Sequence, residues 1–166
     1  ALLARLPHPL LPRLLTGFPP LLALLPGQLL RLQLALAYAL LFIQGAPLNQ
    51  VHQQTERCLE LARRAKFELI ADAIVSLQRL VQALRGHTAH LGSFDDAQFS
   101  ERSFEARVRE RFIHNLCWYQ VRKLQLRYIA GDCVGALEAA DELRERSWVT
   151  FAEPVVPQYA FYSALT

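Results

Sequence analysis

One short polar loop of the chain contains four residues of types that bind metal ions: His87, His90, Asp95 and Asp96. Imidazole and carboxylate groups together are ligands for zinc and other divalent metals. A structural site of this kind needs four ligands in a closed pattern, and residues 87–100 do not show one. We therefore predict that this loop holds no metal.

Two pairs of residues have the types of a nucleophile and its base, or of a base and the acid that orients it. His114 and Cys117 are three positions apart, and His52 and Glu56 are four apart, so the members of each pair share one face of a helix. An activated nucleophile also needs a third group that orients its base, and the sequence supplies none nearby. We predict no catalytic residue in this segment and hence no enzyme.

The cysteines have no pattern that indicates a disulfide or a redox motif. Cys58, Cys117 and Cys133 are an odd number, widely spaced, without a Cys-x-x-Cys pair. Each lies in an apolar helical context, where a small buried side chain is the simplest interpretation. This usage is typical of a reducing compartment, so we expect a cytoplasmic protein.

The stretch "YIAGDCVGALEAADEL", residues 128–143, has the glycines of a ligand-binding loop. Phosphate loops need G-x-x-x-x-G-K-[ST] and dinucleotide folds need G-x-G-x-x-G after a strand, and Gly131 and Gly135 match neither spacing. A helical hairpin explains the stretch better, because Gly131 and Asp132 make a turn and Asp132 caps the following helix. Small residues then let the two helices approach closely: Ala136, Ala139 and Ala140. No bound cofactor is expected.

Helical periodicity extends over most of the chain beyond the first 30 residues. The clearest stripe, in residues 68–86, repeats apolar residues at three- and four-residue steps: Ile70, Ala73, Ile74, Leu77, Leu80, Val81 and Leu84. The helices that we predict cover residues 28–43, 47–67, 68–86, 101–110, 112–130 and 133–146, and residues 148–166 are predicted to begin a further unit and to stop inside its helix. Gly45 and Gly86 are predicted to end two of them as left-handed caps.

Side chains between and along these helices indicate how the helices pack. Phe94, Phe99 and Phe104 are predicted to fix the loop of residues 87–100 to the core. The helix of residues 112–130 carries apolar residues on more than one side, which predicts several neighbours. Its core residues include Trp118 and Tyr128.

Charged residues are predicted to face the solvent. Arg107, Arg109 and Arg111 alternate with acidic residues in a pattern typical of a solvated helix face. Glu60 and Arg64, and likewise Glu142 and Arg146, are four positions apart and are predicted to pair.

The charge distribution argues against nucleic acid as a partner. The formal net charge of the 166 residues is +3, but the first acidic residue is Glu56. Arg5, Arg13 and Arg31 supply the whole excess, so basic and acidic residues balance from Glu56 onward. A phosphate-binding surface needs clustered basic residues.

The first 30 residues differ in composition from the rest. They are rich in Leu, and prolines at 7, 9, 12, 19, 20 and 26 interrupt every apolar run. A membrane helix needs about 20 continuous apolar residues and a signal peptide one continuous apolar stretch, so we predict neither. We divide the chain into an irregular Leu/Pro-rich segment or unreliable fragment end, residues 1–30, and a helical-repeat segment, residues 31–166, that is incomplete at its C-terminus.

The helix ending in "YIAGD" and the following "CVGALEAADELRER" resemble the hairpin of tetratricopeptide (TPR) repeats. Five ordered blocks extend the resemblance: "QGAPLNQV", "AKFELIADAIVSLQRLVQALRGHT", "FDDAQFSERSFEAR", "CWYQVRKLQLRYIAGDCVGALEAA" and "YAFYSALT". Together, over about residues 38–166, they resemble the helical-repeat region of large bacterial signalling proteins. Those proteins place a serine/threonine-kinase-like domain and an AAA-type ATPase before this region, and sensor and histidine-kinase domains after it.

The resemblance implies an all-α fold of stacked antiparallel helix pairs, a fragment of a TPR-like α-solenoid. It implies a non-catalytic segment that couples an ATPase or kinase module to a sensor histidine kinase in signal transduction. Its partners would be flanking domains of the same polypeptide or other proteins, with self-association through exposed repeat ends. The alternatives are a free-standing TPR-like adaptor that binds peptides, and a small helical enzyme. The residues to which we assign structural roles are Gly45, Gly86, Trp118, Tyr128, Gly131, Asp132, Ala136 and Ala140.

Overall fold

The chain is all-helical in the computed structural model, which describes residues 42, 44–144 and 155–166. The described elements are α3 (Leu48–Arg64), α4 (Glu68–Leu84), α5 (Glu101–Arg111), α6 (Ile113–Ile129), α7 (Cys133–Arg144) and α8 (Val155–Leu165). Within those residues helices and turns account for the fold and no strand occurs. The prediction of an all-α protein is therefore confirmed.

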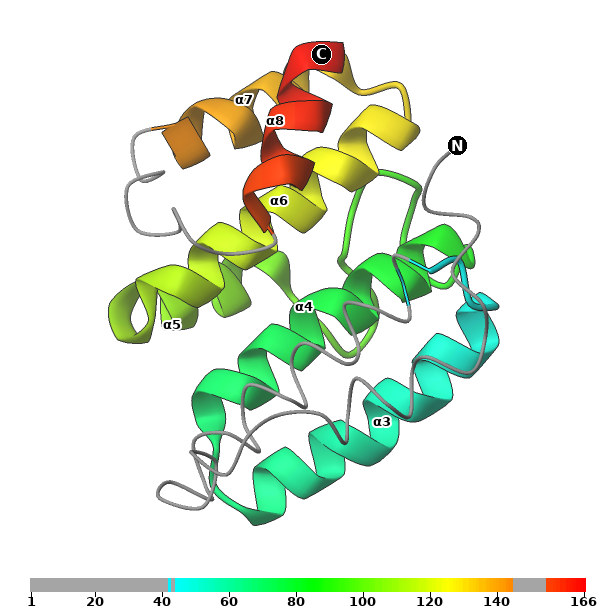
Figure 1. The fold of residues 1–166 in the computed structure, drawn as a ribbon, viewed down its shortest axis with the longest axis vertical. Helices are drawn as coiled ribbons and strands as arrows, with labels where there is room; N and C mark the ends of the chain where they lie inside the picture. The colour runs from blue at the N-terminus through cyan, green and yellow to red at the C-terminus, as the bar shows by residue number, and fades with distance from the viewer. Residues whose placement is uncertain (1–41, 43, 145–154) are drawn as a thin grey trace, which may run out of the picture. The chain divides into compact units, whose positions relative to one another are not determined.

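The helices α3 and α4 form the first hairpin (Figure 1). The buried face of α3 carries Val51, Cys58 and Leu59, and it packs against the apolar stripe of α4. A tight turn joins the two helices, in which Lys66 has a positive φ of 55° and the N–H of Phe67 donates to the carbonyl of Ala62. This turn satisfies a carbonyl at the end of α3 that the helix leaves free.

The helices α6 and α7 form the second hairpin. Small residues on α7 are buried against α6 and keep the two backbones close: Gly135, Ala136, Ala139 and Ala140. In addition to α7, α6 contacts α4, α5 and α8. Buried residues of α6 accordingly belong to three separate apolar clusters. The prediction of neighbours on several sides of this helix is confirmed.

A shared apolar cluster joins the two hairpins. Leu80 of α4 and Tyr119 of α6 are fully buried in it, together with Phe94 from the loop between α4 and α5. Phe104 of α5 is buried there too, and Phe99 packs against it half-buried. The phenylalanines therefore fix the loop to the core, as their spacing predicted.

The helix α8 lies across the second hairpin in Figure 1 and contacts both α6 and α7. Val156, Tyr159 and Tyr162 pack against buried residues of those two helices. The rings of Tyr162 and Tyr128 lie 5.7 Å apart, between centroids, in a tilted pair. Thus α8 packs onto the hairpin α6–α7 through apolar and aromatic side chains.

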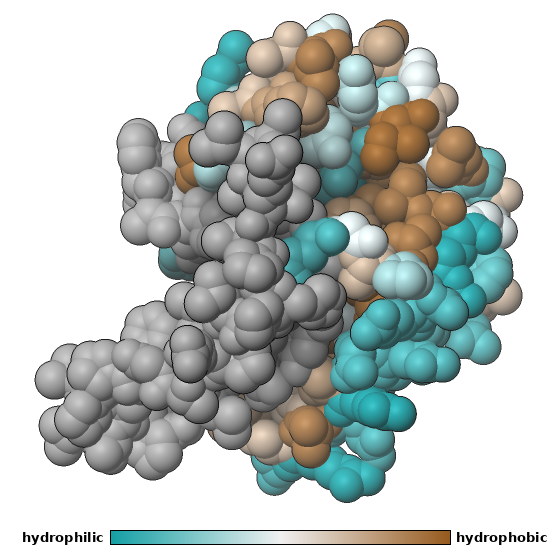
Figure 2. Space-filling view, turned by 45° about the vertical axis from the view of Figure 1, so that its right-hand side comes forward, coloured by the Kyte–Doolittle hydropathy of each residue, from teal (hydrophilic) through white to brown (hydrophobic). Residues whose placement is uncertain are grey.

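Several large apolar side chains reach the surface. Those of the described residues that are exposed are Leu61, Leu69, Leu91, Ile129, Val134, Leu137, Phe161 and Leu165. Figure 2 shows hydrophobic surface gathered in one region of the described face, beside a hydrophilic region. Among the helices of the described residues, none has the length and apolarity that crossing a membrane would require.

Some predictions concern residues outside the described ranges. These are the irregular segment 1–30, its boundary with the repeat segment, nearly all of the helix predicted at 28–43, and the partner Arg146 of Glu142. The end of that first helix does lie within the described residues: the N–H of Gly45 donates to the carbonyl of Phe42, and Gly45 has a φ of +73°.

Candidate functional site

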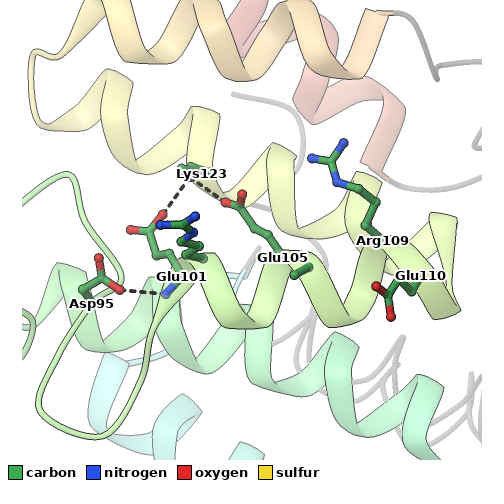
Figure 3. A pocket seen from close by; sticks show the side chains of 8 residues that line it. Asp95, Glu101, Glu105, Arg109, Glu110 and Lys123 are labelled. Carbon is green, nitrogen blue, oxygen red and sulfur yellow. Dashed lines mark hydrogen bonds and ion pairs between the residues drawn. The ribbon is translucent and has the colours of Figure 1, made fainter.

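An open pocket of about 500 Å³ lies beside α5. Residues of the preceding loop, α5 and α6 line it: Asp95, Glu101, Arg102, Glu105, Ala106, Arg109, Glu110 and Lys123 (Figure 3). Side chains of both charges therefore meet there. What these groups can do depends on whether they are available to a ligand or engaged with one another.

Lys123 is engaged with two carboxylates at the wall of this pocket. Its Nζ lies 2.7 Å from Oε2 of Glu101 and 2.6 Å from Oε1 of Glu105. The two glutamates are four positions apart on α5, so both face α6. Burial opposes the charged form of Lys123, but the hydrogen bonds and negative charges of Glu101 and Glu105 outweigh it and raise its pKa. The ammonium group therefore holds α5 to α6.

Glu101 also holds the loop before α5. Its Oε1 accepts hydrogen bonds from the N–H of Phe94 at 2.5 Å and from the hydroxyl of Ser93 at 2.9 Å. Although burial disfavours the charge, the hydrogen bonds from Lys123, Phe94 and Ser93 lower the pKa of Glu101. Only 12% of this side chain is exposed. The carboxylate is thus a fixed structural acceptor.

Tyr119 completes this group of residues from the core side. Its ring packs edge-on against Phe94, with 5.5 Å between centroids, and its hydroxyl donates to Oε2 of Glu101 at 3.2 Å. Burial, followed by the charges of Glu101 and Glu105, raises the pKa of Tyr119 well above its usual value. The phenol therefore stays protonated and serves as a buried hydrogen-bond donor.

The two aspartates of the hypothetical metal site cap turns in the loop. Oδ1 of Asp96 accepts hydrogen bonds from the N–H groups of Gln98 and Phe99, and its Oδ2 pairs with Arg79. Against the effect of burial, these interactions lower the pKa of Asp96. Oδ1 of Asp95 accepts from the N–H of Glu101 at 2.7 Å. Across the described ranges, no cluster of three or more potential metal ligands occurs.

The two histidine pairs occupy different environments. His114 is exposed at the start of α6, whereas the thiol partner Cys117 is buried. Nδ1 of His52 lies 3.6 Å from Oε2 of Glu56, and its Nε2 lies 2.9 Å from Nε2 of Gln82 on α4. The two side chains of the first pair differ in burial. In the second pair, the side chain of His52 also contacts α4.

The glycine corner forms the turn between α6 and α7. Gly131 has a φ of +77°, and the N–H of Asp132 donates to the carbonyl of Arg127 at 2.9 Å. Oδ1 of Asp132 accepts from the N–H of Gly135 at 2.9 Å, which caps α7. Nη1 of Arg127 donates to the carbonyl of Gly135 at 2.7 Å. The N–H groups of Gly131, Asp132 and Gly135 therefore take part in closing the turn and capping α7.

The other residues with expected structural roles lie at turns and in cores. Gly86 has a φ of +74° just after α4, and the next N–H, of His87, donates to the carbonyl of Gln82. Trp118 is half-buried against the cluster of Cys117, Val121 and Leu143. Tyr128, also half-buried, packs against the cluster that contains the three buried alanines of α7, Ala136, Ala139 and Ala140.

Three arginines of α5 do more than face the solvent. All three are exposed, as the sequence predicted, yet each also reaches a carboxylate on another helix. Arg107 bonds to Asp72 of α4 at 2.7 Å, Arg111 pairs with Glu68 of α4, and Arg109 bonds to Glu142 of α7 at 2.6 Å. Glu142 also accepts from Nε2 of Gln120. The alternation of charges could not reveal these long-range pairs.

Sequence reasoning missed two buried charged residues, Asp72 on α4 and Arg122 on α6. Asp72 lies within the apolar stripe of α4, and that position was an available sign of burial. Its pKa is raised by burial in spite of the opposing effect of Arg107. Arg122 follows Val121 on a helix with apolar residues on several sides, so no single polar face was available to it.

No protein-family model, curated protein or solved structure matches this chain. Around the pocket, Lys123 of α6 pairs with Glu101 and Glu105 of α5, and Arg109 of α5 pairs with Glu142 of α7. Acidic and basic side chains of different helices therefore meet at the pocket and pair with one another there.

Proposed function

We propose that this chain is a non-catalytic helical-repeat segment with a TPR-like solenoid arrangement, which couples two modules of a larger signalling protein. The observation that carries the proposal is the sharing of one core by successive helix pairs. The hairpins α3–α4 and α6–α7 meet in the cluster of Leu80, Phe94 and Tyr119, and α8 packs onto the second hairpin. Such a stack passes a displacement from each helix pair to its neighbour.

The ion pairs between helices support a coupling role. Lys123 joins α6 to α5, Arg107 joins α5 to α4, and Arg109 joins α5 to α7. A displacement of one hairpin relative to the other would break these pairs. Buried or half-buried pairs resist such displacement because a separated charge loses its partner.

The modules that we propose are those of the bacterial proteins that the five sequence blocks resemble. A kinase-like domain and an AAA-type ATPase would precede the segment, and a sensor histidine kinase would follow it. The partners are then domains of the same polypeptide, and the segment itself performs no chemistry. This assignment rests on the resemblance, and the ion pairs between helices support it.

The first test is to sequence the genomic DNA on both sides of the segment. We expect the reading frame to continue into an ATPase with a phosphate-binding loop upstream and a histidine-kinase core downstream. A start codon and a stop codon close to the segment would contradict the coupling role. That result would favour the alternative of a free-standing adaptor that binds peptides.

A second test measures coupling in the whole parent protein. Glu101→Gln weakens the joint between α5 and α6, whereas Glu60→Gln removes only an exposed pair with Arg64 on α3. We expect histidine-kinase autophosphorylation to respond less to the nucleotide bound upstream in Glu101→Gln and normally in Glu60→Gln. An unchanged response in both variants, with the fold intact by circular dichroism, would count against the proposal.

A further inference from the structure

The interface between α8 and the hairpin α6–α7 differs in its chemistry from the interfaces between the other helices. The segment 155–166 contains no charged side chain. Its described hydrogen bonds with α6 and α7 are few. Arg122 donates to Gln158, Gln125 donates to the hydroxyl of Tyr162, and the hydroxyl of Tyr159 donates to the carbonyl of Ala140 over a long 3.4 Å. Apolar contacts of Val156, Tyr159 and Tyr162 supply the rest.

Arg122 is a buried cation at this joint. Only 4% of the residue is exposed, and within the described ranges its one hydrogen-bond acceptor is the neutral Oε1 of Gln158, at 3.2 Å. Its guanidinium also lies 5.8 Å from the ring centroid of Phe42. Burial lowers the pKa of Arg122 to about 10, so the group remains charged at neutral pH. A guanidinium has five N–H donors, and among the described residues Arg122 has no carboxylate partner, only the neutral amide of Gln158.

Two further polar atoms close to this interface are buried without a hydrogen-bond partner. Gln125, one turn further along α6, is 7% exposed and donates from its Nε2 to the hydroxyl of Tyr162. Its Oε1 is buried without a hydrogen-bond partner, and so is the hydroxyl of Ser163 on α8. Buried polar atoms without partners favour a state in which water can reach them.

Elsewhere, contacts between elements pair a buried or half-buried charge with an opposite charge. Asp72 has Arg107, Lys123 has Glu101, and Asp96 has Arg79. Each of these pairs compensates part of the cost of burying its members. The charge under α8 lacks such compensation among the described residues.

We infer that α8 is a releasable helix, which undocks from α6 and α7 while the two hairpins stay folded. Undocking lets water reach Arg122 and Gln125, and this hydration offsets part of the apolar contact that is lost. It also uncovers an apolar face formed by residues such as Val121 and Leu143. This inference goes beyond the proposed function and does not depend on it, because it concerns an opening of the fold.

Hydrogen exchange of the 166-residue chain, followed by mass spectrometry, tests the inference. We expect amides of α8 to exchange at least about tenfold faster than those of α4, because local opening precedes global unfolding. Arg122→Met replaces the cation with an apolar side chain and should slow exchange in α8 by roughly tenfold. Arg111→Met is the matched control, since it removes an exposed arginine from the joint between α4 and α5 and should leave α8 unchanged.

A second variant keeps the test decisive if Arg122→Met does not fold. Gln158→Glu leaves Arg122 in place and gives it a carboxylate partner, so exchange in α8 should again slow. The inference is supported if α8 exchanges faster than α4 and at least one of the two variants slows it. It is overturned if α8 is as protected as α4, or if neither variant slows exchange in α8.

Discussion

At the scale of single residues, the main feature is that single charged side chains connect several elements of the fold. Glu101 accepts hydrogen bonds from Lys123, Ser93, Tyr119 and the backbone of Phe94, so one carboxylate connects a loop and two helices. A buried carboxylate is tolerated only with such partners. The loss of that one charge should therefore weaken the contacts among the loop, α5 and α6.

We expect the effect of Glu101→Gln to depend on pH. The folded state lowers the pKa of this carboxylate below its ordinary 4.5. Its stabilising contribution is thus present above that value and is lost as the pH falls through the folded-state pKa. At neutral pH the substitution should lower the free energy of unfolding by about 1 to 2 kcal/mol.

Urea denaturation at a series of pH values checks this expectation. The difference between wild type and Glu101→Gln should shrink as the solution is acidified below the ordinary pKa. Glu60→Gln, on the exposed surface of α3, serves as control and should show little effect at any pH. A difference of the same size at neutral and acidic pH would refute the role assigned to the Glu101 charge.

The pair of Arg107 and Asp72 should matter more than that of Arg111 and Glu68. Both arginines belong to α5 and both are about half exposed, but the side chain of Asp72 is 9% exposed and that of Glu68 is 62% exposed. Arg107→Ala leaves a buried carboxylate without its cation and should cost about 1 to 2 kcal/mol. Arg111→Ala should cost about 0 to 1 kcal/mol. Thermal or chemical denaturation of the two variants gives the comparison, and equal losses would contradict it.

At the scale of secondary structure elements, the turn between α6 and α7 decides how the second hairpin closes. The left-handed conformation of Gly131 lets the N–H of Asp132 satisfy a carbonyl at the end of α6. Asp132 then caps α7 through Gly135. The sequence predicted this turn correctly because glycine followed by a capping residue has a local explanation.

Substitution of Gly131 tests that explanation without steric complications. No atom lies within 4 Å of the Cβ that a side chain would add, so the cost comes from the backbone conformation alone. Gly131→Ala should lower the free energy of unfolding by about 1 to 2 kcal/mol, and Gly131→Asn by less, because asparagine tolerates this conformation better. Urea denaturation of both variants measures the difference. Equal stability of the alanine variant and wild type would show that the turn relaxes to another conformation.

At the scale of the whole described fold, the two hairpins depend on one shared core. Leu80, Phe94 and Tyr119 come from α4, the following loop and α6, and all three are fully buried in one cluster. The hairpins are therefore expected to unfold together. The helix α8 is held by a different kind of interface and is inferred to undock from α6 and α7 before the hairpins unfold.

Leu80→Ala tests the dependence of both hairpins on the shared core. Removal of a fully buried leucine side chain should cost about 2 to 5 kcal/mol. Hydrogen exchange should then accelerate in α3 and in α7 together. Val134→Ala, at a position that is 71% exposed, should change stability by less than about 0.5 kcal/mol. Acceleration confined to α3 and α4 would show that the hairpins unfold independently.

The sequence by itself determined which segments are helical and where they turn. The stripe of α4, the Gly131–Asp132 corner and the three phenylalanines around the loop could each be interpreted from residues a few positions apart. Local periodicity and turn chemistry act over such short spans, and they therefore leave a visible pattern. The same local patterns correctly predicted the exposed pair of Glu60 and Arg64.

Only the tertiary structure decided which charges are buried and with which partners. Arg107 finds Asp72 35 positions away, and Arg109 finds Glu142 33 positions away, at distances in sequence where no periodicity operates. Arg122 becomes buried because α6 has neighbours on several sides, so helix packing rather than residue type sets its environment. The sequence gives the residue types and their order, and the packing of one helix on another decides which of those residues come into contact.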